Sequence, residues 1–356
     1  MPLPDADRLQ LGWDIGGAHV KGCLLQGGLL RDIAQWPCPL WQGMEHLDAA
    51  LGHARARWSE AWTGGLEHAA TMTGEMVDLF EDREQGVARI AERLAASLGP
   101  SLRLFDAEAG WRVPRDAGRG WRGIASANWC ATARVLAARV PQGLLVDIGS
   151  TTTDLIPLRA GSVAAQGASD AERLVTGELV YQGVVRTPLC ALGPRVAWRG
   201  GTANVMNEFF ATTADVYRLT GELDPAHDQS GTADGRGKDA IASRQRLARM
   251  VGRDAADASA AEWLALARWW KDAQVREIEE QLARVAMAAG LAGDAPVIGA
   301  GCGAFLAAAI ARRSGRPFLR YADVALPGSP PDAALAGWAD VCAPAVSVAL
   351  LACERG

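Results

Sequence analysis

The sequence lacks the cysteine pattern of a disulfide-stapled or zinc-binding protein. Its seven cysteines include no C-x-x-C pair, and their number is odd, which argues against a disulfide framework and a zinc ribbon. Basic residues are not in excess either, since 36 Lys and Arg stand against 41 Asp and Glu, for a net charge of −5. The sequence therefore predicts no nucleic-acid partner and no anionic membrane surface.

Long hydrophobic runs are also missing. The N-terminus, MPLPDADRLQ, has no apolar stretch of the kind found in signal peptides. The longest uncharged stretch, residues 295–311, contains three glycines, so a strand, a turn and a helix explain it better than a membrane span. We therefore expect a cytoplasmic protein with reduced thiols and no membrane partner.

Glycine, by contrast, is abundant. The 40 glycines among 356 residues amount to about 11%, against a usual ~7%. No Gly-rich linker is present, and glycines gather in turns that follow apolar strands. We interpret the excess as backbone clearance around an anionic ligand.

The opening pattern of the chain occurs twice. Residues 9–25, LQLGWDIGGAHVKGCLL, and residues 143–158, GLLVDIGSTTTDLIPL, both contain an apolar strand, Asp-Ile-Gly, a small-residue turn and a second strand. This duplication predicts two similar α/β domains. The first takes residues 1–142 together with a terminal helix in residues 338–356, and the second takes residues 143–337.

The second half of the chain has helical periodicity over residues 207–219, 238–251 and 260–290, and residues 338–352 read as one apolar helix. The Gly- and Asp-rich loop at 224–239 is too long and polar for an ordinary connection. We interpret it as a candidate lid, with a solvated insert as the alternative.

Three turns carry candidate ligand-binding residues. In the first, Asp14 ends an apolar strand and Gly16, Gly17, His19 and Lys21 follow; in the second, Asp147 is followed by Gly149, Ser150, Thr151 and Thr152; the third contains Gly299, Gly301 and Gly303. Glycine amides, hydroxyls and a lysine suit phosphate, and an Asp at a strand end can hold hydrated Mg²⁺. Each turn alone could be an ordinary turn, but the repeated Asp-Ile-Gly weakens that reading.

Taken together, the three turns resemble those of the superfamily of sugar kinases, actin and heat-shock chaperones. VDIGSTTTDLIPL and TGELVYQGVVRTPLCAL resemble its hydantoinase A/oxoprolinase branch. MTGEM, IASANW, NEFFATTADVYRLTGEL and TADGRGKD resemble the tetrahydromethanopterin-linked one-carbon-transfer pathway proteins, which include the aminomethylfuran synthase of methanofuran biosynthesis. The first loop departs from that family at His19, where a smaller polar residue often stands.

The resemblance implies two duplicated ribonuclease H-like domains with mixed sheets and a ligand cleft between them. It implies a transferase of methanofuran or methylofuran biosynthesis, which joins an aminomethylfuranmethyl diphosphate to the phenol oxygen of a γ-glutamyl-tyramine or tyrosine-type acceptor and releases diphosphate. Its partners would be these small molecules, and a homodimer stays open. The three turns would bind diphosphate, with Asp14 and Asp147 holding Mg²⁺; ATP binding at the third turn stays open.

A phenol with a pKa near 10 needs a base beside the new ether oxygen. Glu75 is the first candidate, because it follows a predicted strand; Asp154 and Glu178 are rivals, and a helix cap or salt bridge is the alternative for each. Asn128 either lines the cleft or caps a helix. Asp234 and Lys238 of the candidate lid would face phosphate or the acceptor carboxylates.

Two other function classes compete with the transferase. One is an ATP-dependent small-molecule kinase or an oxoprolinase-like ATPase of the same fold, and the other is a nucleotide-gated binding protein. An open adenosine pocket behind residues 299–303 would favour the kinase, whereas a filled one would favour the transferase.

Overall fold

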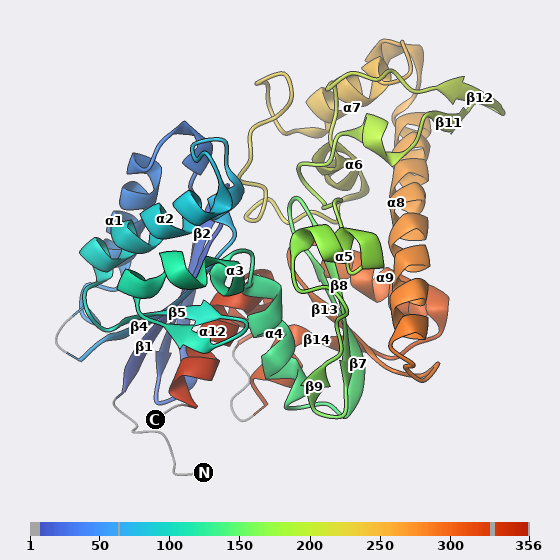
Figure 1. The fold of residues 1–356 in the computed structure, drawn as a ribbon. Helices are drawn as coiled ribbons and strands as arrows, with labels where there is room; N and C mark the ends of the chain where they lie inside the picture. The colour runs from blue at the N-terminus through green and yellow to red at the C-terminus, as the bar shows by residue number, and fades with distance from the viewer. Residues whose placement is uncertain (1–7, 63–64, 328–331, 355–356) are drawn as a thin grey trace. The chain divides into compact units, whose positions relative to one another are not determined.

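The computed structural model describes residues 8–62, 65–327 and 332–354, and the chain divides into two compact units (Figure 1). Unit 1 consists of Met1–Gln142, Leu158–Ala164 and Arg320–Gly356, and unit 2 of Gly143–Pro157 and Ala165–Leu319. The chain returns to unit 1 at Arg320, earlier than the expected residue 338. The extreme ends of the expected first domain, 1–7 and 355–356, lie outside the described residues.

Unit 1 contains a sheet whose strand order is β3-β2-β1-β4-β5-β6. β1 pairs antiparallel with β2 and parallel with β4, and β4 continues parallel with β5. The bounds are β1 Leu9–Ile15, β2 His19–Gln26, β3 Leu29–Pro37, β4 Glu67–Met72, β5 Leu102–Asp106 and β6 Gly110–Arg112.

Helices cover both faces of this sheet. Successive side chains of a strand point to opposite faces, so each face has buried side chains that need a covering helix. Leu11 and Trp13 share a core with α1 (Glu45–Arg57) and α2 (Arg83–Leu98). Gly12 faces the other way, toward α12 (Ala343–Cys353), and a Cβ at Gly12 would lie 2.1 Å from the carbonyl oxygen of Ala345. The remaining α-helices of unit 1 are α3 Trp121–Ile124, α4 Asn128–Ala137, α10 Tyr321–Ala325 and α11 Ala333–Val341.

Unit 2 repeats this topology. Its sheet has the order β10-β8-β7-β13-β14, and β13 runs parallel to β7 as β4 runs parallel to β1. The duplication and the mixed α/β class predicted from the two Asp-Ile-Gly motifs are therefore confirmed. The bounds are β7 Gln142–Ile148, β8 Thr153–Arg159, β10 Leu179–Val180, β13 Val297–Ala300 and β14 Phe318–Arg320. The short strand β9, Ser162–Val163, pairs with the end of β8, and its residues are assigned to unit 1.

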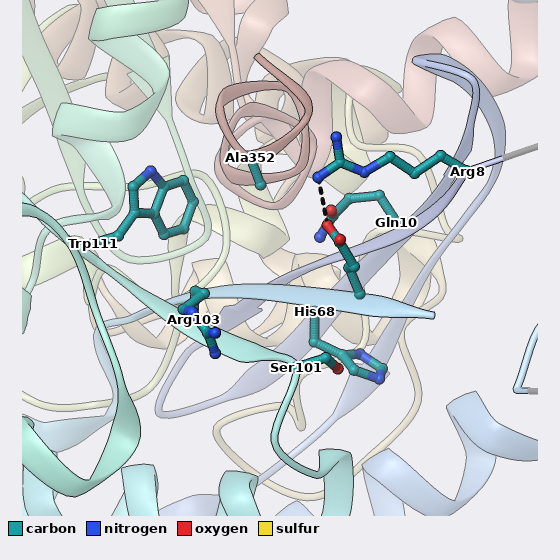
Figure 2. A pocket seen from close by; sticks show the side chains of 8 residues that line it. Arg8, Gln10, His68, Ser101, Arg103, Trp111 and Ala352 are labelled. Carbon is teal, nitrogen blue, oxygen red and sulfur yellow. Dashed lines mark hydrogen bonds and ion pairs between the residues drawn. The ribbon is translucent and has the colours of Figure 1, made fainter. Parts of the chain in front are cut away.

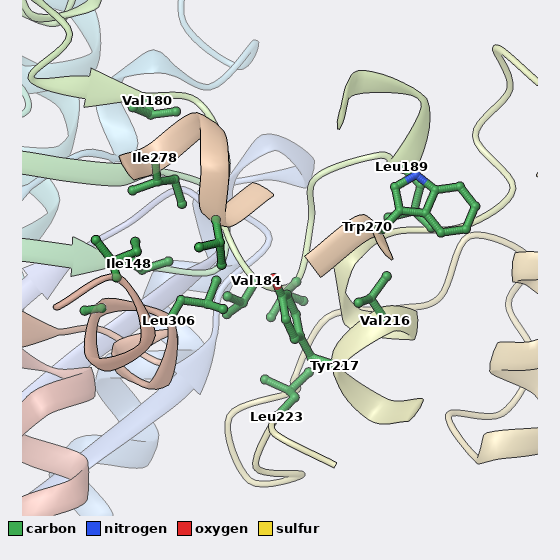
Figure 3. Packing of buried hydrophobic residues seen from close by; sticks show 14 of the residues in the cluster. Ile148, Val180, Val184, Leu189, Val216, Tyr217, Leu223, Trp270, Ile278 and Leu306 are labelled. Carbon is green, nitrogen blue, oxygen red and sulfur yellow. The ribbon is translucent and has the colours of Figure 1, made fainter. Parts of the chain in front are cut away.

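The core of unit 2 lies between this sheet and its helices. Figure 3 shows Ile148 of β7, Leu306 of α9 and Ile278 of α8 among its buried side chains. The hairpin β11–β12 contacts the long helix α8. The bounds are α5 Asp170–Thr176, α6 Thr213–Thr220, α7 Ala240–Arg249, α8 Ala260–Ala288, α9 Ala304–Ser314, β11 Arg195–Trp198 and β12 Gly201–Asn204.

Two helix predictions were wrong. The helix expected over 207–219 begins only at Thr213, because residues before it bond to the 187–189 segment: Leu189 N–H donates to Ala211 O (3.1 Å) and Thr213 N–H to Thr187 O (2.9 Å). The terminal helix is two helices, α11 and α12, bent by 94°. Pro344 in the first turn of α12 explains the break, since proline has no N–H to donate to the carbonyl of residue 340 and its ring clashes with that carbonyl in a continuous helix.

No single helix within the described ranges is long and apolar enough to cross a membrane, although α11 and α12 together pass a test of length and composition. The side chains of α12 from Ala343 to Leu350 are buried.

Candidate active site

The first Asp-Ile-Gly turn closes the β1–β2 hairpin. Gly16 N–H donates to His19 O at 2.9 Å, and His19 is buried. Asp14 is only 4% exposed, and its Oδ2 lies 3.7 Å from Lys21 Nζ. The hairpin therefore brings together the predicted residues of this loop, with the lysine charge beside the aspartate.

Glu75 lies at the same edge of the sheet as this loop. Because β1 and β4 run parallel, Ile15 pairs with Met72 and both strands end together. Thr73 N–H donates to Ile15 O at 2.9 Å, and a Cβ at Gly74 would lie 3.2 Å from that same oxygen. The short 3₁₀ turn Gly74–Met76 therefore places Glu75 next to the first loop.

The Glu75 carboxyl is buried, with 1% exposure. Its Oε1 accepts hydrogen bonds from Ser126 Oγ at 2.8 Å and from Arg83 Nη2 at 3.0 Å, whereas its Oε2 is buried without a hydrogen-bond partner among the residues that the structure describes. Burial raises the pKa of Glu75 above its usual range, against the opposing effects of the Ser126 hydroxyl and the Arg83 charge. Such a carboxyl is suited to proton transfer near neutral pH.

Arg83 and Ser126 were missed in the sequence. Ser126 belongs to the IASANW motif that supports the family resemblance, so the motif itself was a signal. Arg83 is the first residue of α2 and carried no signal. Asn128 is the first residue of α4, whose N-cap is Ala127; the reading of Asn128 as a cap was wrong, and its proposed ligand contact stays a prediction.

In unit 2 the second turn is held by the segment after β10. Gly149 N–H donates to Thr152 O at 2.9 Å, and the oxygens Ser150 Oγ and Thr151 Oγ1 lie 3.4 Å apart. Val184 N–H donates to Gly149 O at 3.0 Å, while the backbone amides of residues 185 and 186 donate to Ser150 O at 3.1 and 2.8 Å. The loop that carries the hydroxyls is thus fixed from outside as well as by its own turn.

The third turn lies beside the second, because Ala300 of β13 pairs with Asp147 of β7. A Cβ at Gly301 (φ +80°) would lie 2.2 Å from Ile148 O and 2.5 Å from Asp147 Oδ1. A Cβ at Gly299 would lie 2.6 Å from the Phe318 ring, and one at Gly303 would lie 2.5 Å from Ile148 Cγ2. The packing of the protein's own atoms therefore requires these glycines, and their proposed contact with a ligand stays a prediction.

Gly301→Ala is expected to lower the melting temperature of the protein by several degrees. The new side chain would meet Ile148 O and would force a positive φ on a non-glycine residue, which costs roughly 1–2 kcal/mol. Thermal unfolding followed by circular dichroism measures the effect. Gly52→Ala in α1 is the control, since its Cβ would meet nothing within 4 Å; equal melting of Gly301→Ala and wild type would contradict the steric account.

The rival bases Asp154 and Glu178 have structural partners. Asp154 Oδ1 accepts from the buried Arg173 at 2.5 Å. Glu178 accepts from the backbone N–H groups of Gln166 (2.6 Å) and Gly167 (2.8 Å) and from Thr176 Oγ1 (2.9 Å). These bonds tie α5 and the loop before it to the sheet, so the geometry favours Glu75 as the base.

The loop 224–239 is anchored to unit 2 through buried ion pairs. Asp234 Oδ1 accepts from Arg246 Nη1 at 3.0 Å, and Lys238 Nζ donates to Asp228 O and lies 3.4 Å from Asp228 Oδ1. The Asp228 carboxylate in turn accepts hydrogen bonds from Arg218 Nε at 2.7 Å and from Arg218 Nη2 at 2.9 Å. Asp234 therefore holds the loop down through Arg246, and Asp228 does so through Arg218, whereas Lys238 bonds to Asp228 within the loop itself. A lid movement would have to break the contacts with Arg218 and Arg246.

A metal at Asp14 or Asp147 would have few protein ligands. Within residues 8–62, 65–327 and 332–354, no group of three or more His, Cys, Asp or Glu could hold a metal ion. Lone carboxylates fit Mg²⁺ that keeps several waters and is bound mainly by substrate phosphates. They do not fit a dedicated metal centre.

A pocket of about 410 Å³ opens at the other end of the unit 1 sheet. Arg8 and Glu67 line it and form an ion pair at 2.7 Å. Figure 2 shows Arg8, Arg103 and Trp111 around the pocket. Glu67 begins β4, whereas Glu75 follows its end. This pocket is therefore separate from the edge that carries Asp14 and Glu75.

Comparison with known proteins places the chain in a family. A (4-{4-[2-(γ-L-glutamylamino)ethyl]phenoxymethyl}furan-2-yl)methanamine synthase from Methanocaldococcus jannaschii is 30% identical over 68% of this chain and 72% of its own. The synthase of the same name from Methanococcus vannielii is 36% identical over 35% of this chain and 55% of its own. These relatives are synthases, which indicates that the chain is an enzyme.

The fold also matches a solved structure. A nucleotide-free acetone carboxylase is 10% identical, with a TM-score of 0.56 over 96% of this chain and 70% of the other; at that identity the likeness concerns the fold alone. The model of the hydantoinase/oxoprolinase family matches residues 67–318. This range takes in β4, Glu75 and the second and third turns, and the chain belongs to the hydantoinase/oxoprolinase family.

Proposed function

We propose that the protein is a transferase that joins an aminomethylfuranmethyl diphosphate to the phenol oxygen of a γ-glutamyl-tyramine or tyrosine-type acceptor. The observation that carries the proposal is the buried Glu75 carboxyl beside the Asp14–Lys21 loop. A base next to an anion-binding loop is what this reaction needs. The name of the M. jannaschii relative supports it, since its product contains a phenoxymethyl-furan ether.

The proposed reaction is an alkyl transfer. The bond between the furanmethyl carbon and the diphosphate oxygen breaks, and its electron pair leaves with diphosphate. The phenol oxygen forms the new bond to that carbon, and its proton passes to Glu75. The furan ring spreads positive charge on the carbon, so the main demand on the protein is to stabilise the departing anion.

We propose phosphate contacts for the residues of the first loop within unit 1, and for those of the second and third turns within unit 2. Lys21 supplies a positive charge in the first loop, 3.7 Å from Asp14, and the second turn supplies the hydroxyls of residues 150–152. Mg²⁺ would neutralise charge on the leaving group, and Asp14 in unit 1 and Asp147 in unit 2 are each proposed as a ligand within their own unit. In the third turn, the Phe318 ring and the Ala307 methyl fill the space behind Gly299, and this filling favours the transferase over an adenosine-binding kinase.

Incubation of the purified protein with the aminomethylfuranmethyl diphosphate, γ-glutamyl-tyramine and Mg²⁺, without ATP, is expected to give the ether and free diphosphate. Mass spectrometry detects the ether, and a parallel reaction without acceptor is the control. Parallel reactions with tyramine or tyrosine in place of γ-glutamyl-tyramine show which phenol the enzyme accepts. No ether, together with ATP hydrolysis that requires an added metabolite, would show an ATP-dependent enzyme of the same fold instead.

A further inference from the structure

Three segments of unit 1 meet at the Glu75 carboxyl. Glu75 comes from the turn after β4, Arg83 from the first residue of α2, and Ser126 from the connection between α3 and α4. Arg83 Nη2 donates to Glu75 Oε1 (3.0 Å) and to Ser126 Oγ (2.8 Å), and Ser126 Oγ donates to the same Oε1 (2.8 Å). The three side chains form a closed hydrogen-bonded triangle on one carboxylate oxygen.

The backbone is shaped to permit this triangle. α2 approaches the turn so closely that a Cβ at Gly86 would lie 2.5 Å from the carbonyl oxygen of Glu75. Ser126 has φ +50°, in the left-handed region that non-glycine residues rarely occupy. Backbone strain of this kind persists where surrounding structure enforces it, and it concentrates at functional sites.

We propose that Arg83 and Ser126 are positioning residues, which hold Oε1 of Glu75 so that Oε2 alone takes the proton from the acceptor. This inference rests on the proposed function, in which Glu75 is the base. Oε2 is buried, and no described residue of the chain forms a hydrogen bond with it. The side chain of Glu75 is fully buried whereas that of Arg83 is 27% exposed, so the arginine covers the carboxyl on the side of its bonded oxygen.

The two partners also set the charge state of the base. Burial raises the pKa of Glu75, and the Arg83 charge and the Ser126 hydrogen bond oppose that rise. Of the elements packed on the carboxyl, α2 contributes the charged Arg83, the α3–α4 connection contributes the Ser126 hydroxyl, and the turn contributes its own backbone. Loss of the arginine charge therefore raises the pKa further, and a higher pH is then needed to ionise the base.

Arg83→Met is expected to move the acid limb of the kcat/KM profile upward by about one to two pH units, since a neighbouring opposite charge shifts a carboxyl by that order. Turnover at pH 7 should fall about tenfold or more, with KM for the diphosphate substrate little changed. Arg83→Lys retains the positive charge and should bring the acid limb most of the way back to its wild-type pH. Ser126→Ala should lower kcat by a smaller factor.

Arg93→Met is the matched control, because Arg93 lies on the same helix and forms an exposed ion pair with Asp48 at 2.8 Å. The pH profile of kcat/KM for Arg93→Met should be the same as that of the wild type. If Arg83→Met fails to fold, Arg83→Lys and Ser126→Ala carry the test. Wild-type profiles and wild-type kcat in all the Arg83 and Ser126 variants that fold would overturn the proposal.

A second readout separates this proposal from the proposed function. The Glu75 side-chain carboxyl can be titrated by ¹³C NMR in selectively labelled protein without substrate, with Glu75→Gln to assign its signal. A higher titration midpoint in Arg83→Met supports the positioning role even if no ether forms. An unchanged midpoint overturns the role even if the enzyme is the proposed transferase.

Discussion

Replacing Glu75 by glutamine is expected to lower kcat for ether formation by about 10²- to 10⁴-fold, the usual contribution of a general base. The amide keeps the shape of the carboxyl and can still accept from Ser126 and Arg83 through its oxygen. It cannot take a proton from the phenol. Steady-state kinetics measures the loss, and calorimetric titration should show nearly unchanged affinity for the diphosphate substrate.

Glu67→Gln is the control for this substitution. Glu67 begins β4, pairs with Arg8 and is 43% exposed, so its loss should leave kcat within about a factor of two, as expected of surface substitutions. In the wild type the acid limb of kcat/KM should lie above the ordinary glutamate pKa of about 4.3, because burial raises the pKa of Glu75. Full turnover by Glu75→Gln would remove Glu75 from the mechanism.

Arg246→Met is expected to destabilise unit 2 by about 3–5 kcal/mol, the cost of breaking a buried ion pair on one side. The Arg246 side chain is fully buried; Nε donates to Asp215 Oδ1 at 2.8 Å and Nη1 to Asp234 Oδ1 at 3.0 Å. In the variant, Asp215 keeps its ion pair with Arg218 at 3.0 Å but loses the one with Arg246. Thermal unfolding should show a melting point lower by roughly 10 °C, at 2–4 °C per kcal/mol.

The same substitution should expose the 224–239 loop to protease, because Arg246 Nη2 also donates to Gly237 O at 3.0 Å. Limited proteolysis at fixed temperature measures this. Arg313→Met is the control, since Arg313 and Glu279 form a partly exposed pair, of the kind worth at most about 1 kcal/mol. Equal stability and equal cleavage in the two variants would show that the buried network does not hold the loop.

The features that could be predicted from sequence are those encoded by short patterns. Short apolar segments located β1 and β7, and the repeated Asp-Ile-Gly predicted the shared topology of the two sheets. Glu75 could be proposed because it follows an apolar strand and precedes a turn. Each inference needed only a window of about ten residues, where side-chain periodicity mirrors the geometry of the backbone.

The features that could not be predicted depend on contacts across the chain. Ser126 bonds to Glu75 over 51 positions of sequence, and Arg246 meets Asp215 over 31, so no local pattern marks either pair. The glycines of the third turn were assigned to a ligand, since sequence does not show that Phe318 packs on Gly299. The break near Pro344 could have been foreseen, because a proline inside a helix removes a backbone hydrogen bond and clashes with the preceding turn.

The C-terminal helix has a consequence for the order in which the protein folds during synthesis. α12 packs on β1, β2 and β4, and Cys23 Sγ in β2 donates to Ala345 O at 3.4 Å. One face of the first sheet to leave the ribosome therefore stays uncovered until the last helix follows. Unit 2, whose residues lie between, can complete its core earlier, so in a nascent chain this face, which carries Gly12 and Cys23, would lack its covering helix for most of translation and would be open to chaperones during that interval.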